Sequence, residues 1–438
     1  MTDIPSATSA PVARPERRAW IVLVILCFVY VLNFLDRQLL SILAKPIQDD
    51  LGITDGQIGL ISGLYFAIFY CVVSIPVAWL ADRTNRVKVL AFACALWSAA
   101  TVACGLARNY PQLAVARMTV GLGEAGGVPP SYAIISDYFP PGTRGTALGL
   151  YNFGPPIGQM LGVAFGASIA AAYSWRDAFI FIGVIGIVAA LAVYLFVPEP
   201  KRGRLDAAPA AAPVEVEAPA RFMDTFRMFF TRPVLLRVAL ACGATQFITY
   251  GSLNFTTLFL MREKGMTLGE IAIWYALVIG IFTTLGMYVS GRLTDRFVAR
   301  TKKAYAYIPA IGLVLAVPFF IGFVWAPSWQ LALLFLALPT GLNYFYLSPA
   351  VALVQEAVRP NQRVLAGALL LLVMNLIGLG LGPTWVGLAS DWFRAAYPDN
   401  SLQMAFYTLV PFYGLAVLLF LALARALGRE AAATGKAA

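Results

Sequence analysis

The chain has 438 residues, of which 60% are hydrophobic and 12% are charged, and its mean hydropathy is +0.76. Soluble domains carry about a quarter charged residues and disordered chains are polar, so the composition excludes both classes. At roughly 20 apolar residues per helical span, this length holds about a dozen spans and predicts a polytopic membrane protein.

The net charge is +10, and the sequence contains no histidine. An excess of Lys and Arg is typical of the cytoplasmic loops of membrane proteins, so we expect no nucleic-acid partner. Without histidine or a CxxC spacing, a zinc or haem centre and a Ser-His-Asp hydrolase are not expected. The phosphate-binding lysine motif of ATPases is also missing. We therefore expect neither a cofactor nor an enzymatic activity.

Twelve apolar runs follow one another along the chain, and each is long enough to span a membrane as a helix. Residues 1–18 are polar and lack the features of a signal peptide, so the first run is predicted to be a retained helix. Unbroken apolar runs exclude a β-barrel, whose strands alternate. The runs are 19–43, 57–80, 87–107, 111–137, 144–172, 177–197, 233–260, 268–291, 305–325, 329–354, 364–390 and 402–427.

The segment between the sixth and seventh runs differs in composition, being rich in Ala and Pro with mixed charges. It is predicted to be a flexible linker between two six-helix bundles. The predicted organisation is an N-tail 1–18, a bundle 19–197, a linker 198–232, a bundle 233–427 and a C-tail 428–438.

The orientation is predicted from the basic residues. With the N-terminus inside, 24 of the 32 Lys and Arg fall in inside segments and 6 in outside loops. This bias predicts that both termini lie in the cytoplasm. The alanine-rich composition suggests a bacterial inner membrane, and a monomer is expected.

Matching motifs occur in the two halves. AWLADRTNRVK (78–88) follows the second run and GRLTDRFVARTKK (291–303) follows the eighth, while FGPPIGQMLG (153–162) and LGLGPTWVG (379–387) lie at equivalent places. Such parallel repeats are typical of transporters. Together with RMTVGLGEA (117–125), these motifs resemble the major facilitator superfamily, which implies an all-α fold of twelve transmembrane helices in two pseudo-symmetric bundles.

Within that superfamily, four stretches are similar to the Spinster family of lipid transporters. This resemblance implies transport of lysophospholipids or sphingolipid-type phosphates, with proton coupling in some members. A second resemblance, to proton-coupled symporters of small organic anions, shares the Asp-Arg pair of the first run and the Arg and Glu of the fourth. The four stretches are NFLDRQ (33–38), DRTNR (82–86), FACALWS (92–98) and RMTVGLGEA (117–125).

Four ionisable residues are predicted to lie deep inside spans: Asp36 and Arg37 in the first, and Arg117 and Glu124 in the fourth. Each costs at least ~2.5 kcal/mol on insertion scales, so such residues are rarely incidental. Arg117 and Glu124 are seven residues apart, which places them on one helix face about 10 Å from each other. We predict that Asp36 and Glu124 carry protons and that Arg37 and Arg117 bind an anionic head group. The alternative is a fixed salt-bridge cluster that holds the N-terminal half together.

The spans of the C-terminal half carry neutral polar residues in place of charges. Tyr250, Asn254 and Thr257 share a helix face at i, i+4 and i+7. Each neutral residue could equally make an interhelical hydrogen bond. The predicted cavity lining comprises Asn33, Tyr250, Asn254, Thr257, Asn343 and Tyr346.

The superfamily resemblance implies that the loop after the second run latches the two halves at the cytoplasmic side in the outward-open state, with Asp137 at the inner end of the fourth run as a candidate partner. The alternative is a plain cluster of basic anchors. The predicted gate residues are Asp82, Arg83, Arg86, Asp137, Asp295 and Arg296.

The sequence thus predicts a secondary transporter that works by alternating access, with protons and membrane lipids as further partners. An anionic amphiphile such as a lysophospholipid is the expected substrate, because a charged half faces an apolar, aromatic one. A small organic anion is the alternative substrate. A receptor or a lipid scramblase with the same fold is the alternative class.

Overall fold

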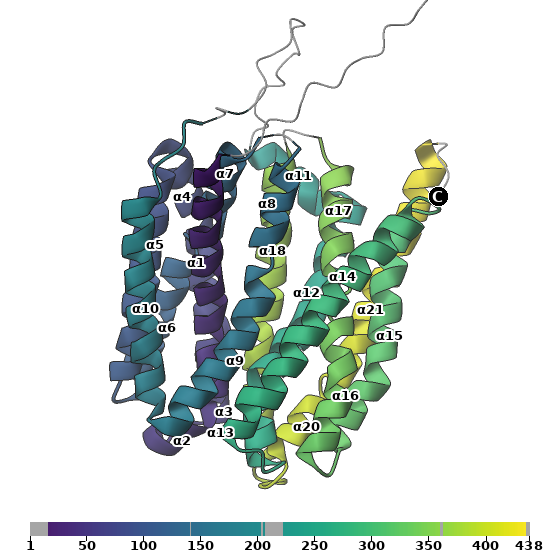
Figure 1. The fold of residues 1–438 in the computed structure, drawn as a ribbon. Helices are drawn as coiled ribbons and strands as arrows, with labels where there is room; N and C mark the ends of the chain where they lie inside the picture. Colours follow the sequence, from purple (N-terminus) through teal and green to yellow (C-terminus); the bar gives the residue numbers. More distant parts are fainter. Residues whose placement is uncertain (1–15, 141, 203–204, 206–221, 360–361, 435–438) are drawn as a thin grey trace, which may run out of the picture.

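Figure 1 shows a bundle of long helices in the computed structural model, which describes residues 16–140, 142–202, 205, 222–359 and 362–434. The face at which the first helix begins and the last one ends is called the tail face, and the opposite one the far face. All regular elements in these described ranges are helical, which confirms the predicted all-α class.

Ten helices lie within the described residues of the first half. They are α1 (Arg17–Ile42), α2 (Ala44–Leu51), α3 (Asp55–Ser62), α4 (Leu64–Arg83), α5 (Arg86–Leu106), α6 (Tyr110–Glu124), α7 (Val128–Tyr138), α8 (Arg144–Tyr151), α9 (Gly154–Ala172) and α10 (Trp175–Phe196).

The second half follows a short helix, α11 (Phe222–Thr231), and contains two π-helical stretches, η1 and η3. Its elements are α12 (Pro233–Arg262), α13 (Leu268–Glu270), η1 (Ile271–Tyr275), α14 (Ala276–Val298), α15 (Ala304–Trp325), α16 (Trp329–Leu342), α17 (Leu347–Ala357), α18 (Arg363–Met374), η3 (Asn375–Leu381), α19 (Gly382–Phe393), α20 (Ser401–Tyr407) and α21 (Val410–Thr434).

Eleven helical stretches within the described residues are long and apolar enough to cross a membrane. They coincide with eleven of the twelve predicted runs. The remaining run, 111–137, is divided into α6 and α7 by a turn at residues 125–127. The division follows from the sequence, because two glycines and then Pro129 and Pro130 come shortly after Glu124, and proline is tolerated only in the first turn of a helix.

The predicted linker is not featureless at its end, because α11 occupies residues 222–231. Thr225 and Phe229 are fully buried, while Phe222, Met223 and Phe226 are exposed. Thr225 and Phe229 are four residues apart and so share one helix face, and α11 packs against α18 and α12. The prediction of a flexible linker throughout 198–232 is therefore wrong for this part; residues 206–221 lie outside the described ranges.

Side-chain caps explain where several helices begin. Thr54 and Gln57 form a capping box at α3, and Thr267 and Glu270 form another at α13. Single side chains cap four further helices, and such caps satisfy the first backbone N–H groups of a helix. These caps are Asn85 at α5, Asn109 at α6, Ser174 at α10 and Ser328 at α16.

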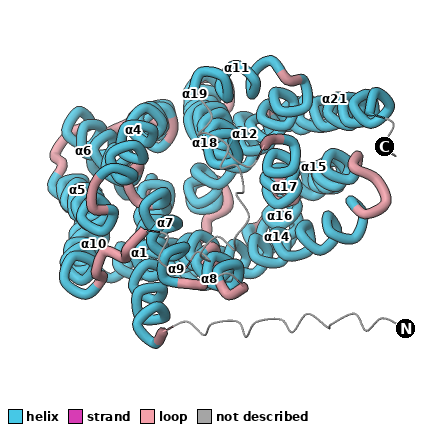
Figure 2. Tube along the Cα trace, turned by 90° about the horizontal axis from the view of Figure 1, so that it is seen from above, coloured by secondary structure: helices cyan, strands magenta, loops and turns pink. Residues whose placement is uncertain are grey.

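Seen from the tail face, the helices form two groups, with α1 and α4–α10 in one and α12 and α14–α21 in the other (Figure 2). α9 packs against α1 within the first group, and a Cβ atom at Gly158 would lie 2.5 Å from the Val31 carbonyl oxygen, so only glycine fits this contact. Several pairs of elements join the two halves, among them α1 with α12, α9 with α14, α3 with α19 and α4 with η3. The charged residues of α1 and α6 therefore lie close to the junction of the two halves.

Candidate functional site

Asp36 and Arg37 of α1 form two separate ion pairs with the charged residues of α6. Arg37 Nε donates to Glu124 Oε2 at 2.5 Å, and Arg117 Nη1 lies 3.8 Å from Asp36 Oδ1. The adjacent residues Asp36 and Arg37 point in different directions around α1, so each meets a different partner on α6. The structure thus brings together all four residues that the sequence singled out.

Asp36 lies inside the first half. Its side chain is 2% exposed, and its Oδ2 accepts a hydrogen bond from Thr101 Oγ1 of α5 at 2.7 Å. Thr101 was not predicted as a site residue, because a threonine in an apolar span commonly bonds its own backbone. Thr101 does this as well, donating to the Trp97 carbonyl.

Arg37 is surrounded by aromatic rings. Its guanidinium carbon lies 4.9 Å from the ring centre of Phe34, 5.3 Å from Phe66 and 5.0 Å from Tyr70. Phe66 also lies 5.5 Å from the guanidinium of Arg117, so both arginines contact this one ring. Cation–π attraction is strongest where water is excluded, and these contacts hold Arg37 in place without using all of its N–H donors.

Several polar atoms of the two pairs have no hydrogen-bond partner among the described residues, although they are buried. They are Asp36 Oδ1, Glu124 Oε1, and Nε and Nη1 of Arg117. Buried polar groups in proteins are nearly always satisfied, so these atoms are candidates to meet water, a proton or a ligand.

A pocket between the halves adjoins this group. It holds about 20 Å³ of free space, which is room for about one water molecule. In this conformation the pocket is therefore too narrow for a substrate. It is lined by Phe34, Arg37, Gln38, Ser62, Phe66, Arg117, Gln159, Tyr250, Leu253, Asn254 and Leu379.

Two of the six residues predicted to line a cavity, Tyr250 and Asn254, line this pocket. Asn33, Thr257 and Tyr346 are buried away from it. Asn343 lines a second small pocket inside the C-terminal half and donates to the Tyr413 hydroxyl at 3.0 Å. Of these four side chains, Asn343 makes the interhelical hydrogen bond of the alternative interpretation, whereas Asn33 Oδ1 and Thr257 Oγ1 have no hydrogen-bond partner among the described residues.

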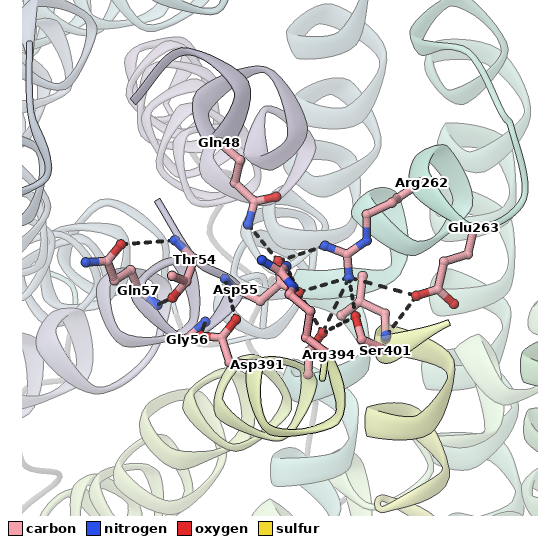
Figure 3. A network of polar contacts seen from close by, with 12 residues as sticks. Gln48, Thr54, Asp55, Gly56, Gln57, Arg262, Glu263, Asp391, Arg394 and Ser401 are labelled. Carbon is pink, nitrogen blue, oxygen red and sulfur yellow. Dashed lines mark hydrogen bonds and ion pairs between the residues drawn. The ribbon is translucent and has the colours of Figure 1, made fainter. Parts of the chain in front are cut away.

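A polar network closes the far face, and it centres on the buried carboxylate of Asp55 (Figure 3). Arg262 at the end of α12 donates to both Asp55 oxygens, at 3.0 and 2.9 Å, and Arg394 donates to Oδ2 at 3.0 Å. Ser390 and Gln48 donate to the same carboxylate, each at 2.6 Å. A bidentate Arg–carboxylate pair is among the strongest hydrogen-bonded contacts in proteins, so Asp55 ties the first half to the second.

Two acids support this network. Asp391 of α19 accepts from the backbone N–H groups of Asp55 and Gly56, at 3.1 and 2.8 Å, and so caps α3 from the other half. Glu263, just outside the span of α12, accepts from the N–H groups of Leu402 and Gln403. Burial raises the pKa of Glu263.

The far-face network was missed because an Asp after a Thr at a helix start is an ordinary capping pattern. One feature of the sequence could have indicated this network. Basic residues are scarce in the predicted outside loops, and Arg262 and Arg394 are two of the six found there. A third, Arg176, is paired with Asp50, so these three arginines on the far face stand opposite acids.

At the tail face, the predicted gate residue Arg86 binds within its own half. It donates to Asp137 at 2.6 Å and to Glu199 at 2.7 Å, which ties the start of α5 to the ends of α7 and α10. Arg86 and Asp137, predicted as a latch between the halves, thus form an intra-half contact in this conformation. That is the expected result where the far face, and not the tail face, is held closed.

The other predicted gate residues lie at the tail face. The Arg83 guanidinium stacks 4.1 Å from the Trp79 ring, and Asp295 and Arg296 lie exposed on α14. Asp82 belongs to α4, but its side chain lies outside what the structure describes. The described hydrogen bonds that join the halves cluster toward the far face, and they include Ser41 to the Asn254 carbonyl and Thr384 to the Gly59 carbonyl.

Comparisons with known proteins agree with this architecture. Residues 26–382 match the model of the Major Facilitator Superfamily. An MFS-type efflux pump of Mycolicibacterium smegmatis is 34% identical over 395 residues, covering 90% of each chain. A hexuronate transporter of Bacillus subtilis is 26% identical over 379 residues, covering 84% of this chain and 87% of the relative.

Among solved structures, a bacterial homologue of the human lysosomal transporter Spinster, in an inward-facing and unoccupied conformation, superposes with a TM-score of 0.87. The two sequences are 28% identical, and the match covers 95% of this chain and 99% of that one. Transport across a membrane, and not enzymatic catalysis, is the activity of these folds. The chain therefore belongs to the Major Facilitator Superfamily and is a multi-pass membrane transporter of the Spinster type.

Proposed function

We propose that this protein is a proton-coupled secondary transporter that moves an anionic amphiphile, such as a lysophospholipid or a sphingolipid phosphate, by alternating access. Both termini lie in the cytoplasm in this proposal, as the distribution of basic residues predicts. The tail face is then the inner side, and the structure corresponds to an inward-facing conformation, like that of its solved Spinster-type relative.

The observation that carries the proposal is the incomplete pairing of four buried charges beside a pocket between the halves. A fixed structural cluster is stable only if its remaining polar atoms are hydrogen-bonded. Here Arg117 keeps two N–H-bearing atoms unbonded among the described residues, and Glu124 keeps one oxygen unbonded. An anionic head group that enters this pocket meets Arg37 and Arg117 together.

The ion pair between Arg37 and Glu124 supplies a coupling step. A head group that binds Arg37 takes the cation away from Glu124. The carboxylate is then buried without its partner, which is costly inside a membrane, and taking up a proton removes that cost. Asp36 and Arg117 form a second acid–arginine pair next to the Arg37–Glu124 pair. Thr101 holds Asp36 in place by a hydrogen bond.

The apolar residues of the pocket and the rings around Arg37 suit the hydrocarbon part of an amphiphile. Phe34, Phe66 and Tyr70 surround Arg37, and Leu253 and Leu379 face the pocket from the other half. An acyl chain needs only apolar contacts of this kind; the neutral polar side chains of Gln38, Gln159 and Asn254 line another part of the pocket.

A small organic anion is the second candidate, supported by one specific observation: a relative that is 26% identical is a hexuronate transporter. The two arginines suit a carboxylate as well as a phosphate. Such an anion would bind the same two arginines and would not need the aromatic rings around Arg37.

Competition binding separates the two candidates. The purified full chain in lipid nanodiscs is titrated with a fluorescent lysophosphatidylglycerol, and unlabelled lysophosphatidylglycerol and glucuronate compete for it. The proposal predicts displacement by the lysolipid alone and loss of binding in Arg37→Ala. Displacement by glucuronate at lower concentration would favour the organic anion.

Arg176→Ala is the matched control for this experiment. Like Arg37, Arg176 pairs with a carboxylate, that of Asp50, and its guanidinium lies 4.2 Å from an aromatic ring, that of Trp175. It lies at the far face, away from the pocket, so binding is expected to be unchanged. Equal loss in both variants would show that the effect of Arg37→Ala is structural.

A further inference from the structure

A third cavity lies on the outside of the first half, and it is much larger than the central pocket. This groove between α4, α5 and α6 has about 400 Å³ of free space, against about 20 Å³ in the pocket beside Arg37. Figure 2 shows α4, α5 and α6 at the edge of the molecule that is remote from α15 and α21. Phe92, which lines the groove, is exposed, so the groove opens on the outer surface of the first half.

The walls of the groove are apolar over most of its length. They comprise Val77 and Leu80 of α4, Val89, Phe92 and Leu96 of α5, and Leu122 of α6. Phe92 is 71% exposed, so the groove is not closed by the protein itself. From Lys88 to Leu96, the helix extends about 12 Å into the membrane. A channel of this shape and polarity fits an extended hydrocarbon chain.

The tail-face end of the groove is polar and basic. Thr84, Asn85 and Lys88 line it. Lys88 is exposed, and its Nζ has no ion-pair or hydrogen-bond partner among the described side chains. Thr84 and Asn85 already bond backbone groups, the Leu80 carbonyl and the Lys88 N–H, so Lys88 is the group at this end that remains for a ligand.

Two described basic side chains at this end, Arg83 and Lys88, are exposed. Arg86 is balanced by Asp137 and Glu199, whereas Arg83 makes its described contact with the Trp79 ring. Trp79 is 58% exposed, as expected for a tryptophan at the boundary between hydrocarbon and head groups. A negatively charged head group fits this basic end.

We infer that this groove is a binding site for an anionic phospholipid of the adjoining membrane leaflet, with its acyl chain between α4, α5 and α6 and its head group at Lys88. The site is separate from the pocket between the halves and does not depend on which substrate is carried. Leu122 and Gly123, which line the groove, immediately precede Glu124, so the bound chain contacts the end of α6 that presents this carboxylate.

Photochemical labelling tests the site. The full chain is reconstituted in phosphatidylcholine nanodiscs that contain a small fraction of phosphatidylglycerol with a photoactivatable acyl chain, and adducts are mapped by mass spectrometry. We expect adducts concentrated at residues 89–96. The same probe with a phosphatidylcholine head group should label this segment about fivefold less, the factor that corresponds to ~1 kcal/mol for a basic residue near an anionic surface.

Two variants and a control make the result decisive. Lys88→Glu should lower labelling at least about fivefold, while Lys302→Glu, an exposed lysine at the tail face of the other half, should leave it unchanged. Val89→Trp, which fills the groove, should remove adducts from Phe92 and Leu96. Adducts spread evenly over the membrane-facing helices, equal labelling by both head groups, or labelling unaffected by Lys88→Glu would overturn the inference.

Discussion

Arg37 makes a 2.5 Å hydrogen bond to Glu124 and has three aromatic rings within 5.3 Å of its guanidinium, whereas Arg117 contacts one ring. The rings restrict the guanidinium plane, and its exposed fraction of 12% faces the pocket. A planar cation with several N–H groups can bind Glu124 and an incoming anion in turn, which a point charge cannot do in the same geometry.

Arg37→Lys is therefore expected to weaken lysophosphatidylglycerol binding about tenfold, although the charge is kept. The lysine loses the stacked contacts, which are worth ~1–2 kcal/mol where water is excluded. Equilibrium binding in nanodiscs measures the change. Unaltered affinity would show that the rings and the guanidinium plane have no part in recognition.

Some of the functional residues could be predicted from the sequence, and others could not. Asp36, Arg37, Arg117 and Glu124 could be found because a charge inside an apolar span is costly and therefore rare. Asp55 could not be found in this way, because it begins a helix at a membrane boundary, where an acid is ordinary. Its importance arises from Arg262 and Arg394, which are 207 and 339 residues away in sequence.

At the scale of elements, the spans were predictable and their interruptions were only partly so. The length of an apolar run predicts a helix to within a few residues, as for α9, whose span was predicted at 144–172 and is found at Arg144–Ala172 together with α8. The π-helical stretches η1 and η3 depend on packing between helices, which a single sequence does not contain. α11 was missed because its apolar face is only about three turns long.

The contact of α3 with α19 depends on a glycine, and this gives a prediction for Gly59→Ala. A Cβ atom there would lie 2.5 Å from the Pro383 carbonyl oxygen and 3.3 Å from the Gly387 Cα atom. The helices must separate, at a cost of about 1–3 kcal/mol, so the thermal unfolding temperature should fall.

Gly149→Ala is the control for this change. Gly149 is also helical, but a Cβ atom added there would meet no neighbouring atom within 4 Å. This variant should be neutral or more stable by ~0.5–1 kcal/mol, because alanine favours helices. Equal unfolding temperatures for the two variants, measured by scanning fluorimetry, would refute the role of the close contact.

At the scale of the whole molecule, the two halves are held together toward the far face, and the opposite ends carry the exposed residues Arg83, Asp295 and Arg296. Alternating access requires that this far-face closure be reversible. The Asp55 network joins the halves only through hydrogen bonds and ion pairs, which can break and form again. Its arginines depend on Asp55, because removing this carboxylate leaves them without a partner.

Asp55→Asn is expected to open the far face. Loss of one partner of a buried ion pair costs about 3 kcal/mol or more, which shifts a two-state equilibrium by about a hundredfold. Spin labels at the exposed positions 49 and 400, in a chain without its native cysteines, should report a longer distance in this variant. Asp50→Asn, whose carboxylate binds Arg176 within one half, should keep the short distance; an unchanged distance in Asp55→Asn would contradict the role of the network.

The most direct test of coupled transport through the Arg37–Glu124 pair is uptake of fluorescent lysophosphatidylglycerol into proteoliposomes under an imposed pH gradient. We predict accumulation above equilibrium that a protonophore abolishes, and that Glu124→Gln, correctly folded and still able to bind the lysolipid, does not accumulate it. Accumulation by Glu124→Gln equal to that of the unaltered protein, or lipid movement that ignores the pH gradient, would contradict the account.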